Sequence, residues 1–184
     1  MNHGDDLSFA SEIQQLQWLD QEDARMADAI RRHGWAVQVV FGEGCWGPPN
    51  CPCDRPRGVS PPYAYTIGLH GFDHPELLIY GMDPHTSAKV LNDLGERVRR
   101  GQSMTHGEVV TFTNWPHRLK LFTFRDDAET PALIGAQRYY QRTRDNPVPA
   151  LQCVWDDRGR RFPWDEGYEP PAGLQPLPQS HTRA

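Results

Sequence analysis

The segment YTIGLHGFDHPELLIYGM, residues 65–82, holds the clearest structural pattern in the chain. Two runs rich in β-branched and aromatic residues flank a polar loop, which is typical of two neighbouring strands. We predict strands over residues 63–69 and 76–82, and the short loop HGFDHP between them favours antiparallel pairing. Asp83 is a favoured helix N-cap and Pro84 suits the first helical position, so a helix should follow.

The elements on either side of this segment alternate between helices and strands. Apolar residues at helical spacing, an acidic start and a basic end before Gly34 predict a helix over 21–33. The other predicted elements are strands over 35–41, 108–113, 118–124 and 150–155, and helices over 84–100 and 131–144. We therefore expect an α+β fold: a curved, mainly antiparallel sheet or a small split-barrel-like β-barrel, with helices packed on it.

The 184 residues fit a single domain with extensions. Residues 1–19 are expected to form a poorly ordered extension or a short helix. Residues 20–166 should be the α+β domain, which contains a loop rich in Cys, Pro and Gly at 42–62. Residues 167–184 should be a loosely attached, Pro-rich C-terminal tail.

Composition narrows the range of functions. Hydrophobic residues make up 38% and charged residues 23%, as in a globular protein. The net charge of -5 argues against nucleic-acid binding, which requires a basic surface. No apolar run is long enough for a membrane span, and the polar N-terminus lacks signal-peptide features. We expect a cytoplasmic protein with reduced thiols.

The central segment and two later runs resemble a bacterial family of domains of unknown function. The resemblance rests on YTIGL (65–69) and HPELL (74–78), with LQCVWDD (151–157) and GRRFPW (159–164) further on, and covers roughly residues 21–166. It implies no established activity, so no catalytic residue is carried over. The three cysteines of the 42–62 loop depart from the family pattern. The layout of residues 63–100 is also similar to flavin-binding split barrels, which suggests flavin by analogy of layout alone.

The loop of the central segment contains candidate catalytic residues. A His near a carboxylate can act as an acid–base pair, and two His with a carboxylate can hold a metal. This makes His70, His74 and Glu76 the candidate catalytic groups. The alternative is structural, with His74 and Pro75 shaping the turn and Glu76 forming a salt bridge.

Thr66, Gly68 and Arg118 are candidate cofactor-binding residues. A Gly within a strand often marks a bulge or the close approach of a ligand or a backbone segment. The small face at Thr66 and Gly68 suits a flat cofactor, and it equally suits a tightly packed helix. Arg118 is a candidate for binding an anionic group.

Cys45, Cys51 and Cys53 are candidate zinc ligands. Three thiols in one Pro- and Gly-rich loop can bind zinc with His70, His74 or Cys153 as the fourth ligand. Free thiols and a redox-active pair are the alternatives.

Two classes of function follow, and the sequence leaves open whether the protein is an enzyme. The first is a small-molecule or cofactor-binding enzyme with a pocket around residues 65–76. The second is a non-catalytic protein-interaction module of the accessory or immunity type. Because split-barrel proteins often dimerise, a homodimer is expected in either class.

Overall fold

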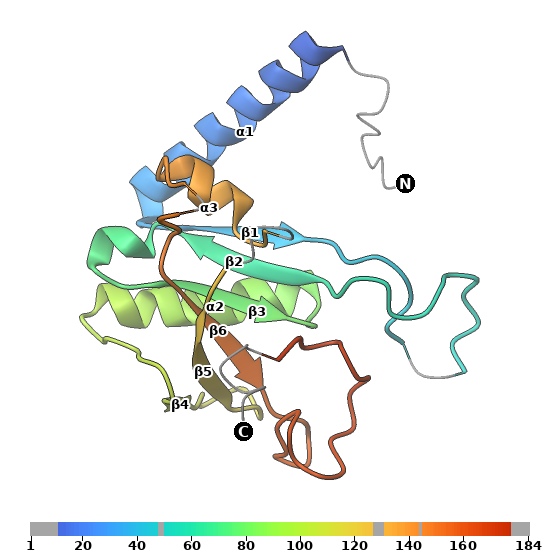
Figure 1. Ribbon diagram of the computed structural model, residues 1–184. Helices are drawn as coiled ribbons and strands as arrows, with labels where there is room; N and C mark the ends of the chain where they lie inside the picture. Colours follow the sequence, from blue (N-terminus) through green and yellow to red (C-terminus); the bar gives the residue numbers. More distant parts are fainter. Residues whose placement is uncertain (1–10, 48–49, 127–130, 144, 178–184) are drawn as a thin grey trace.

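The computed structural model describes residues 11–47, 50–126, 131–143 and 145–177. Its centre is a six-stranded sheet in the order β1-β2-β3-β6-β5-β4 (Figure 1). The strands are β1 (Ala36–Val40), β2 (Tyr63–Ile67), β3 (Glu76–Tyr80), β4 (Val109–Val110), β5 (Leu119–Phe124) and β6 (Ala150–Trp155). The helices are α1 (Glu12–His33), α2 (Pro84–Arg99) and α3 (Ile134–Tyr139), and the 3-10 turn η2 spans Leu69–Phe72.

The predicted α+β fold with a mainly antiparallel sheet is confirmed. All neighbouring strands pair antiparallel except β3 and β6, which run parallel. The alternative of a small barrel is wrong, because the sheet stays open and β4 at its edge has only two residues. The analogy with flavin-binding split barrels therefore loses the layout on which it rested.

Helices cover both faces of the sheet (Figure 1). On one face, α2 packs through Leu91 and Leu94 against Leu77, Ile79 and their neighbours. On the other face, Tyr65, Ile67 and Leu78 form a second core with the side chains of α1 and α3. The alternation of side chains along β2 and β3 thus serves two cores rather than one core and a solvated face.

Helix α1 begins earlier than predicted. Ser11 and Gln14 form a capping box, in which the Ser11 side chain accepts from the Gln14 N–H and the Gln14 side chain accepts from the Ser11 N–H. The helix therefore extends over residues expected to lack clear order. Its predicted end at Gly34 is confirmed, with Gly34 in the left-handed conformation.

Two later elements are shorter than predicted. Strand β4 ends at Val110. The next carbonyl, that of Thr111, accepts two hydrogen bonds of 3.1 Å from the Arg97 guanidinium instead of pairing with a strand. Helix α3 ends at Tyr139, and Gln141 has a positive φ of 53° that a helix cannot continue through. The helix start at Asp83 and Pro84 is confirmed.

The described part of the C-terminal tail is held more firmly than expected. Leu174 and Gln175 are buried, and the Gln175 side chain bonds both the N–H and the carbonyl of Trp155. The tail thus packs beside the end of β6. None of the helices in the described part of the chain combines the length and apolar character that crossing a membrane requires.

Candidate functional site

Three candidate residues of the central segment, Thr66, Gly68 and His70, gather around Glu76, whose side chain is fully buried. Its carboxylate accepts hydrogen bonds from the hydroxyls of Thr66 and Tyr140, both at 2.6 Å. It also accepts from the backbone N–H groups of Gly68 at 2.9 Å and His70 at 3.1 Å. We call these five residues the Glu76 centre. They tie together β2, η2, β3 and the end of α3.

Among the described residues, none of the hydrogen bonds to the Glu76 carboxylate comes from an imidazole. His70 reaches Glu76 through its backbone N–H, while its imidazole Nε2 accepts from Arg142 at 3.1 Å. The predicted salt bridge is also absent among the described residues, because the donors to Glu76 are hydroxyls and amides. Four hydrogen bonds compensate the buried charge instead, as a buried carboxylate requires.

The hydroxyls of Thr66 and Tyr140 donate to Glu76 and each also accept a hydrogen bond from a backbone N–H. The Thr66 hydroxyl accepts from the Leu77 N–H at 2.8 Å, where a strand carbonyl would otherwise be the acceptor. Burial, and next the negative charge of Glu76, raise the pKa of Tyr140 well above its ordinary value. Tyr140 therefore keeps its proton and serves as a hydrogen-bond donor rather than as a base.

Gly68 serves close backbone packing. Its φ is 130°, and a Cβ built there would lie 2.5 Å from the carbonyl oxygen of Gly34 and 2.6 Å from Cα of Trp35. The backbone between α1 and β1 thus packs closely against Gly68. The sequence allowed either a flat cofactor or a tightly packed helix at this position, and the neighbour in the structure is a backbone segment.

His74 lies in the core, apart from the Glu76 hydrogen bonds. Its Nε2 accepts from the buried Met104 N–H at 3.1 Å, so Nδ1 carries the proton and donates to the Pro75 carbonyl at 2.7 Å. Both ring nitrogens are bound to backbone groups. His74 thereby fixes the chain after α2 to the start of β3.

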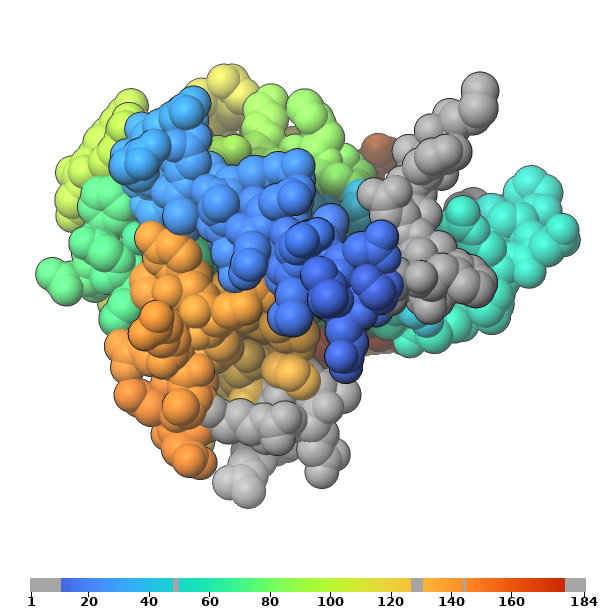
Figure 2. Space-filling model, turned by 90° about the horizontal axis from the view of Figure 1, so that it is seen from above, coloured from blue at the N-terminus to red at the C-terminus, as the bar shows by residue number. Residues whose placement is uncertain are grey.

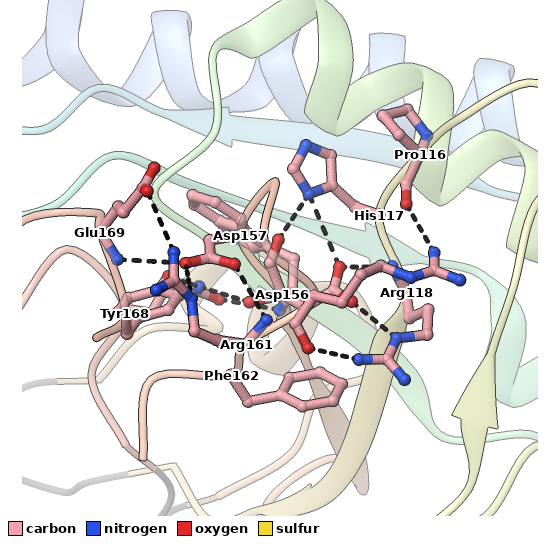
Figure 3. A network of polar contacts seen from close by, with 12 residues as sticks. Pro116, His117, Arg118, Asp156, Asp157, Arg161, Phe162, Tyr168 and Glu169 are labelled. Atoms are coloured by element: carbon pink, nitrogen blue, oxygen red, sulfur yellow. Dashed lines mark hydrogen bonds and ion pairs between the residues drawn. The ribbon is translucent and has the colours of Figure 1, made fainter. Parts of the chain in front are cut away.

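Arg118 belongs to a second polar network, at the ends of β5 and β6 (Figure 3). Its N–H and Nε donate to the buried Asp156 carboxylate at 2.7 Å and 2.6 Å. Asp157 accepts in the same way from the N–H and Nε of Arg161, both at 2.9 Å. The Arg118 guanidinium thus donates both to Asp156 and to the Arg160 carbonyl, the latter at 2.6 Å.

The three cysteines of the 42–62 loop lie together. The Sγ atoms of Cys45, Cys51 and Cys53 are all within 4.8 Å of one another, a group we call the thiol cluster. None of the expected fourth ligands, His70, His74 or Cys153, belongs to this group. The loop projects from the body of the protein beyond β1 and β2, as both views show (Figures 1 and 2).

Backbone bridges and side-chain hydrogen bonds within the 42–62 loop stabilise its conformation around the cysteines. Backbone bridges join Glu43 to Ser60 and Cys45 to Arg57, and the Trp46 indole donates to the Ser60 carbonyl at 3.0 Å. The Arg57 guanidinium donates to the Cys45 sulfur at 3.0 Å and to the Gly47 carbonyl at 2.8 Å. The sulfur atoms therefore sit on a folded turn.

Surrounding donors stabilise the Cys45 thiolate. The Cys53 S–H, and after it the Gly47 N–H, lower the pKa of Cys45 to about 7, with Cys51 and the positive charge of Arg57 adding to the effect. The contact with Cys45 raises the pKa of Cys53. The pKa of Cys45 is therefore lower than that of Cys53.

Sequence reasoning did not place Tyr140 or Arg57 in these sites. Tyr140 is 64 residues from Glu76, and no local pattern connects them. Arg57 follows the cysteines in the same loop, so a search for cations near the thiols could have found it. The buried carboxylates of Asp156 and Asp157 were part of the family resemblance but had no assigned role.

The fold and these sites define an α+β protein with helices on both faces of an open mixed sheet. The chain belongs to the family described as Domain of unknown function (DUF4262), whose model matches residues 29–169. The matched range contains the Glu76 centre, the paired aspartates and the thiol cluster. No curated protein and no solved structure matches the chain. The resemblance to a family without an established activity is confirmed.

Proposed function

We propose that the protein binds a thiophilic divalent metal ion, zinc, at the thiol cluster. The observation that carries this proposal is the convergence of three sulfur atoms within 4.8 Å of one another. Cysteine sulfur is a preferred zinc ligand, with a Zn–S distance of about 2.3 Å. Three sulfurs around one ion at that distance lie about 4 Å apart, so the cluster needs only small adjustments to hold it.

The surroundings of the sulfur atoms suit a metal site. The Cys45 sulfur accepts a hydrogen bond of 3.0 Å from the Arg57 guanidinium. Such bonds disperse the negative charge of ligating thiolates and orient them. Three thiolates exceed the charge of a divalent ion by one, and the Arg57 guanidinium beside Cys45 supplies the balancing positive charge.

Gly47 leaves room beside the sulfurs. A Cβ at this position would lie 3.4 Å from the Cys51 sulfur and 3.6 Å from the Cys45 sulfur. The space that this methyl group would fill is therefore open to an ion or to its external ligand.

The ligand count favours an accessible ion over a closed structural site. Zinc sites that only stabilise a fold usually have four protein ligands, whereas sites that bind small molecules keep one position open. Within the described residues the cluster offers three ligands, and Cys53 is exposed. The fourth position would take water or a small molecule, which supports the small-molecule or cofactor-binding class.

The Glu76 centre supports this class less well. Its polar groups are bonded to one another and to the backbone, so a ligand would have to displace these bonds. Its hydrogen bonds account for the presence of a carboxylate in the core without a substrate.

Cobalt titration tests the proposal, because cobalt bound to thiolates gives intense charge-transfer absorption. The reduced wild-type protein should bind one equivalent, with absorption proportional to sulfur ligation, and zinc should displace it. Cys51→Ser should reduce both affinity and absorption. Cys153→Ala is the matched control, because this buried cysteine lies in β6 outside the cluster. Cobalt binding without thiolate absorption would refute the assignment. An equal loss of affinity and absorption in Cys153→Ala and Cys51→Ser would also refute it.

The second candidate is an interaction module with another copy of this chain as its partner. Helix α1 projects from the domain (Figure 1), and its first half exposes Ile13 by 67% and Leu16 by 61%. Exposed apolar groups of this kind favour a helix-to-helix contact. Sedimentation of the wild type and Leu16→Lys tests it: a dimer that the substitution dissociates supports the module, and a monomeric wild type removes it.

A further inference from the structure

We infer that the thiol cluster is also a redox site, in which Cys45 and Cys53 form a disulfide on reaction with a hydroperoxide and thereby give up the metal ion. The inference rests on the proposed metal site for the release of the ion. The disulfide itself requires only the three cysteines.

Three observations favour the pair Cys45 and Cys53. Their sulfur atoms lie within 4.8 Å of each other, close enough for small movements of the loop to join them. The Arg57 guanidinium, 3.0 Å from the Cys45 sulfur, stabilises negative charge there and so favours a nucleophile at this position. Cys53 is exposed, which brings the pair to the solvent from which an oxidant arrives.

Cys45 and Cys51 also lie within 4.8 Å of each other, so the exposure of Cys53 is what favours Cys53 as the partner of Cys45. The remaining pairs fit less well. Cys51 and Cys53 are separated only by Pro52, and a disulfide across one residue closes a small, strained ring. Cys153 is fully buried in β6 and outside the cluster, and burial raises its pKa to about 12. Cys51 thus remains as the single thiol of the oxidised cluster.

The reaction balances with one hydroperoxide. The Cys45 thiolate attacks the terminal oxygen of ROOH, the O–O bond breaks, and the leaving alkoxide takes a proton to become ROH. The resulting sulfenic acid on Cys45 is attacked by the Cys53 sulfur, an S–S bond forms, and hydroxide leaves as water with the thiol proton. Two thiols are oxidised by two electrons, and the hydroperoxide is reduced to an alcohol and water.

Oxidation and metal binding exclude each other. A disulfide leaves Cys51 as the one remaining thiol in the cluster, and one thiol cannot replace three ligands. Conversely, a bound ion engages both sulfurs, so the disulfide can form only as the ion leaves. The loop thus has two states, a reduced state that holds the ion and an oxidised state that does not.

The test treats reduced, metal-free full-length protein with tert-butyl hydroperoxide and identifies the products by mass spectrometry. The expected product of the wild type has lost two hydrogen masses and contains one cross-link, between the peptides of Cys45 and Cys53. Cys51→Ala should form the same cross-link, whereas Cys53→Ala should give no intramolecular disulfide. A wild type that forms only sulfinic or sulfonic acids, or that pairs other cysteines, would overturn the inference.

A second measurement separates this inference from the metal proposal. Zinc-loaded wild type is treated with the same hydroperoxide, and the released ion is detected with a chromophoric chelator. Release of one equivalent of zinc at the same rate as the cross-link forms supports both the metal proposal and the redox inference. If the metal-free protein forms the cross-link but cobalt and zinc do not bind, the redox inference stands and the metal proposal fails. If the ion binds and no cross-link forms, the metal proposal stands and the redox inference fails.

Discussion

The Glu76 centre and the thiol cluster illustrate two ways in which a protein can gather reactive side chains. In the centre, every polar group has a partner within the fold, and the carboxylate is sealed from solvent. In the cluster, the three sulfur atoms lie within 4.8 Å of one another, on a loop that projects from the domain (Figure 2). Polar groups whose hydrogen bonds are all made within a buried site stabilise a fold. Thiols gathered on a projecting loop, one of them exposed, can bind an ion instead.

Substitutions in the two regions should therefore affect different properties of the protein. Changes in the Glu76 centre and around it should cost stability. Changes in the thiol cluster should alter metal binding and thiol chemistry while the domain stays folded.

The largest effect is expected from Gly68→Ala. The new Cβ would meet the backbone of Gly34 and Trp35 at about 2.5 Å, at a φ of 130° that other residues rarely adopt. We expect a loss of ~4 kcal/mol in the free energy of unfolding, measured by urea denaturation. Gly71→Ala is the control, because its Cβ would have nothing within 4 Å. Equal effects of both substitutions would contradict the packing role of Gly68.

Glu76→Gln should cost about 3 kcal/mol, because the new amide would point N–H groups at hydroxyl and amide donors in a buried site. Denaturation midpoints measure the loss, with the exposed Glu166→Gln as the control. The comparison fails if Glu76→Gln keeps full stability, since the carboxylate would then be kept for another purpose.

His74→Ala should also destabilise the domain, by ~2 kcal/mol, because the buried Met104 N–H would lose its acceptor. Thermal unfolding measures this, and His85→Ala on the exposed face of α2 is the control. A stable His74→Ala protein would return His74 to the list of candidate reactive groups.

The network at Asp157 should make stability depend on pH. Burial opposes ionisation, but the N–H groups of Arg161 and Glu169 outweigh it and lower the pKa of Asp157. The unfolded chain therefore binds a proton first as the pH falls. The stabilisation is present above the ordinary Asp pKa of about 3.9 and is lost as the pH falls through the lower folded value.

Urea denaturation at about pH 6 and about pH 3 measures this dependence. The midpoint should fall less between the two pH values in Asp157→Asn than in the wild type. An unchanged difference would mean that other carboxylates cause the acid sensitivity.

The smallest effect concerns the thiol cluster in its metal-free form. The ultraviolet absorbance of thiolate should rise through a midpoint at about pH 7 as Cys45 loses its proton. Cys53→Ala removes the strongest donor to the Cys45 sulfur, so the midpoint should move to higher pH while the unfolding temperature changes little. A midpoint that stays in place would show that Cys53 does not stabilise the thiolate.

Much of the fold follows from local patterns. The runs around YTIGL and ELLIY predict β2 and β3, and Asp83 with Pro84 predicts the start of α2. The sheet order does not follow, because β3 pairs with β6 across about 70 residues of chain and this parallel pairing has no local signal. The earlier start of α1 depended on the capping box at Ser11, which stands outside the apolar stripe.

The candidate site was predictable only in part. Spacing alone grouped Cys45, Cys51 and Cys53, because all three lie in one loop. The role of Glu76 was not predictable, since Tyr140 reaches it from the end of α3. His70 and His74 are close in sequence, yet their rings bind different partners, Arg142 and Met104.

The most direct test of the account is a native mass spectrum of freshly purified, reduced protein beside a Cys45→Ser, Cys51→Ser, Cys53→Ser triple variant. The account predicts one zinc ion on the wild type, none on the variant, and the same folded charge-state distribution for both. Zinc that persists on the variant, or its absence from a wild type supplied with zinc, would contradict the central claim that the thiol cluster is the functional site.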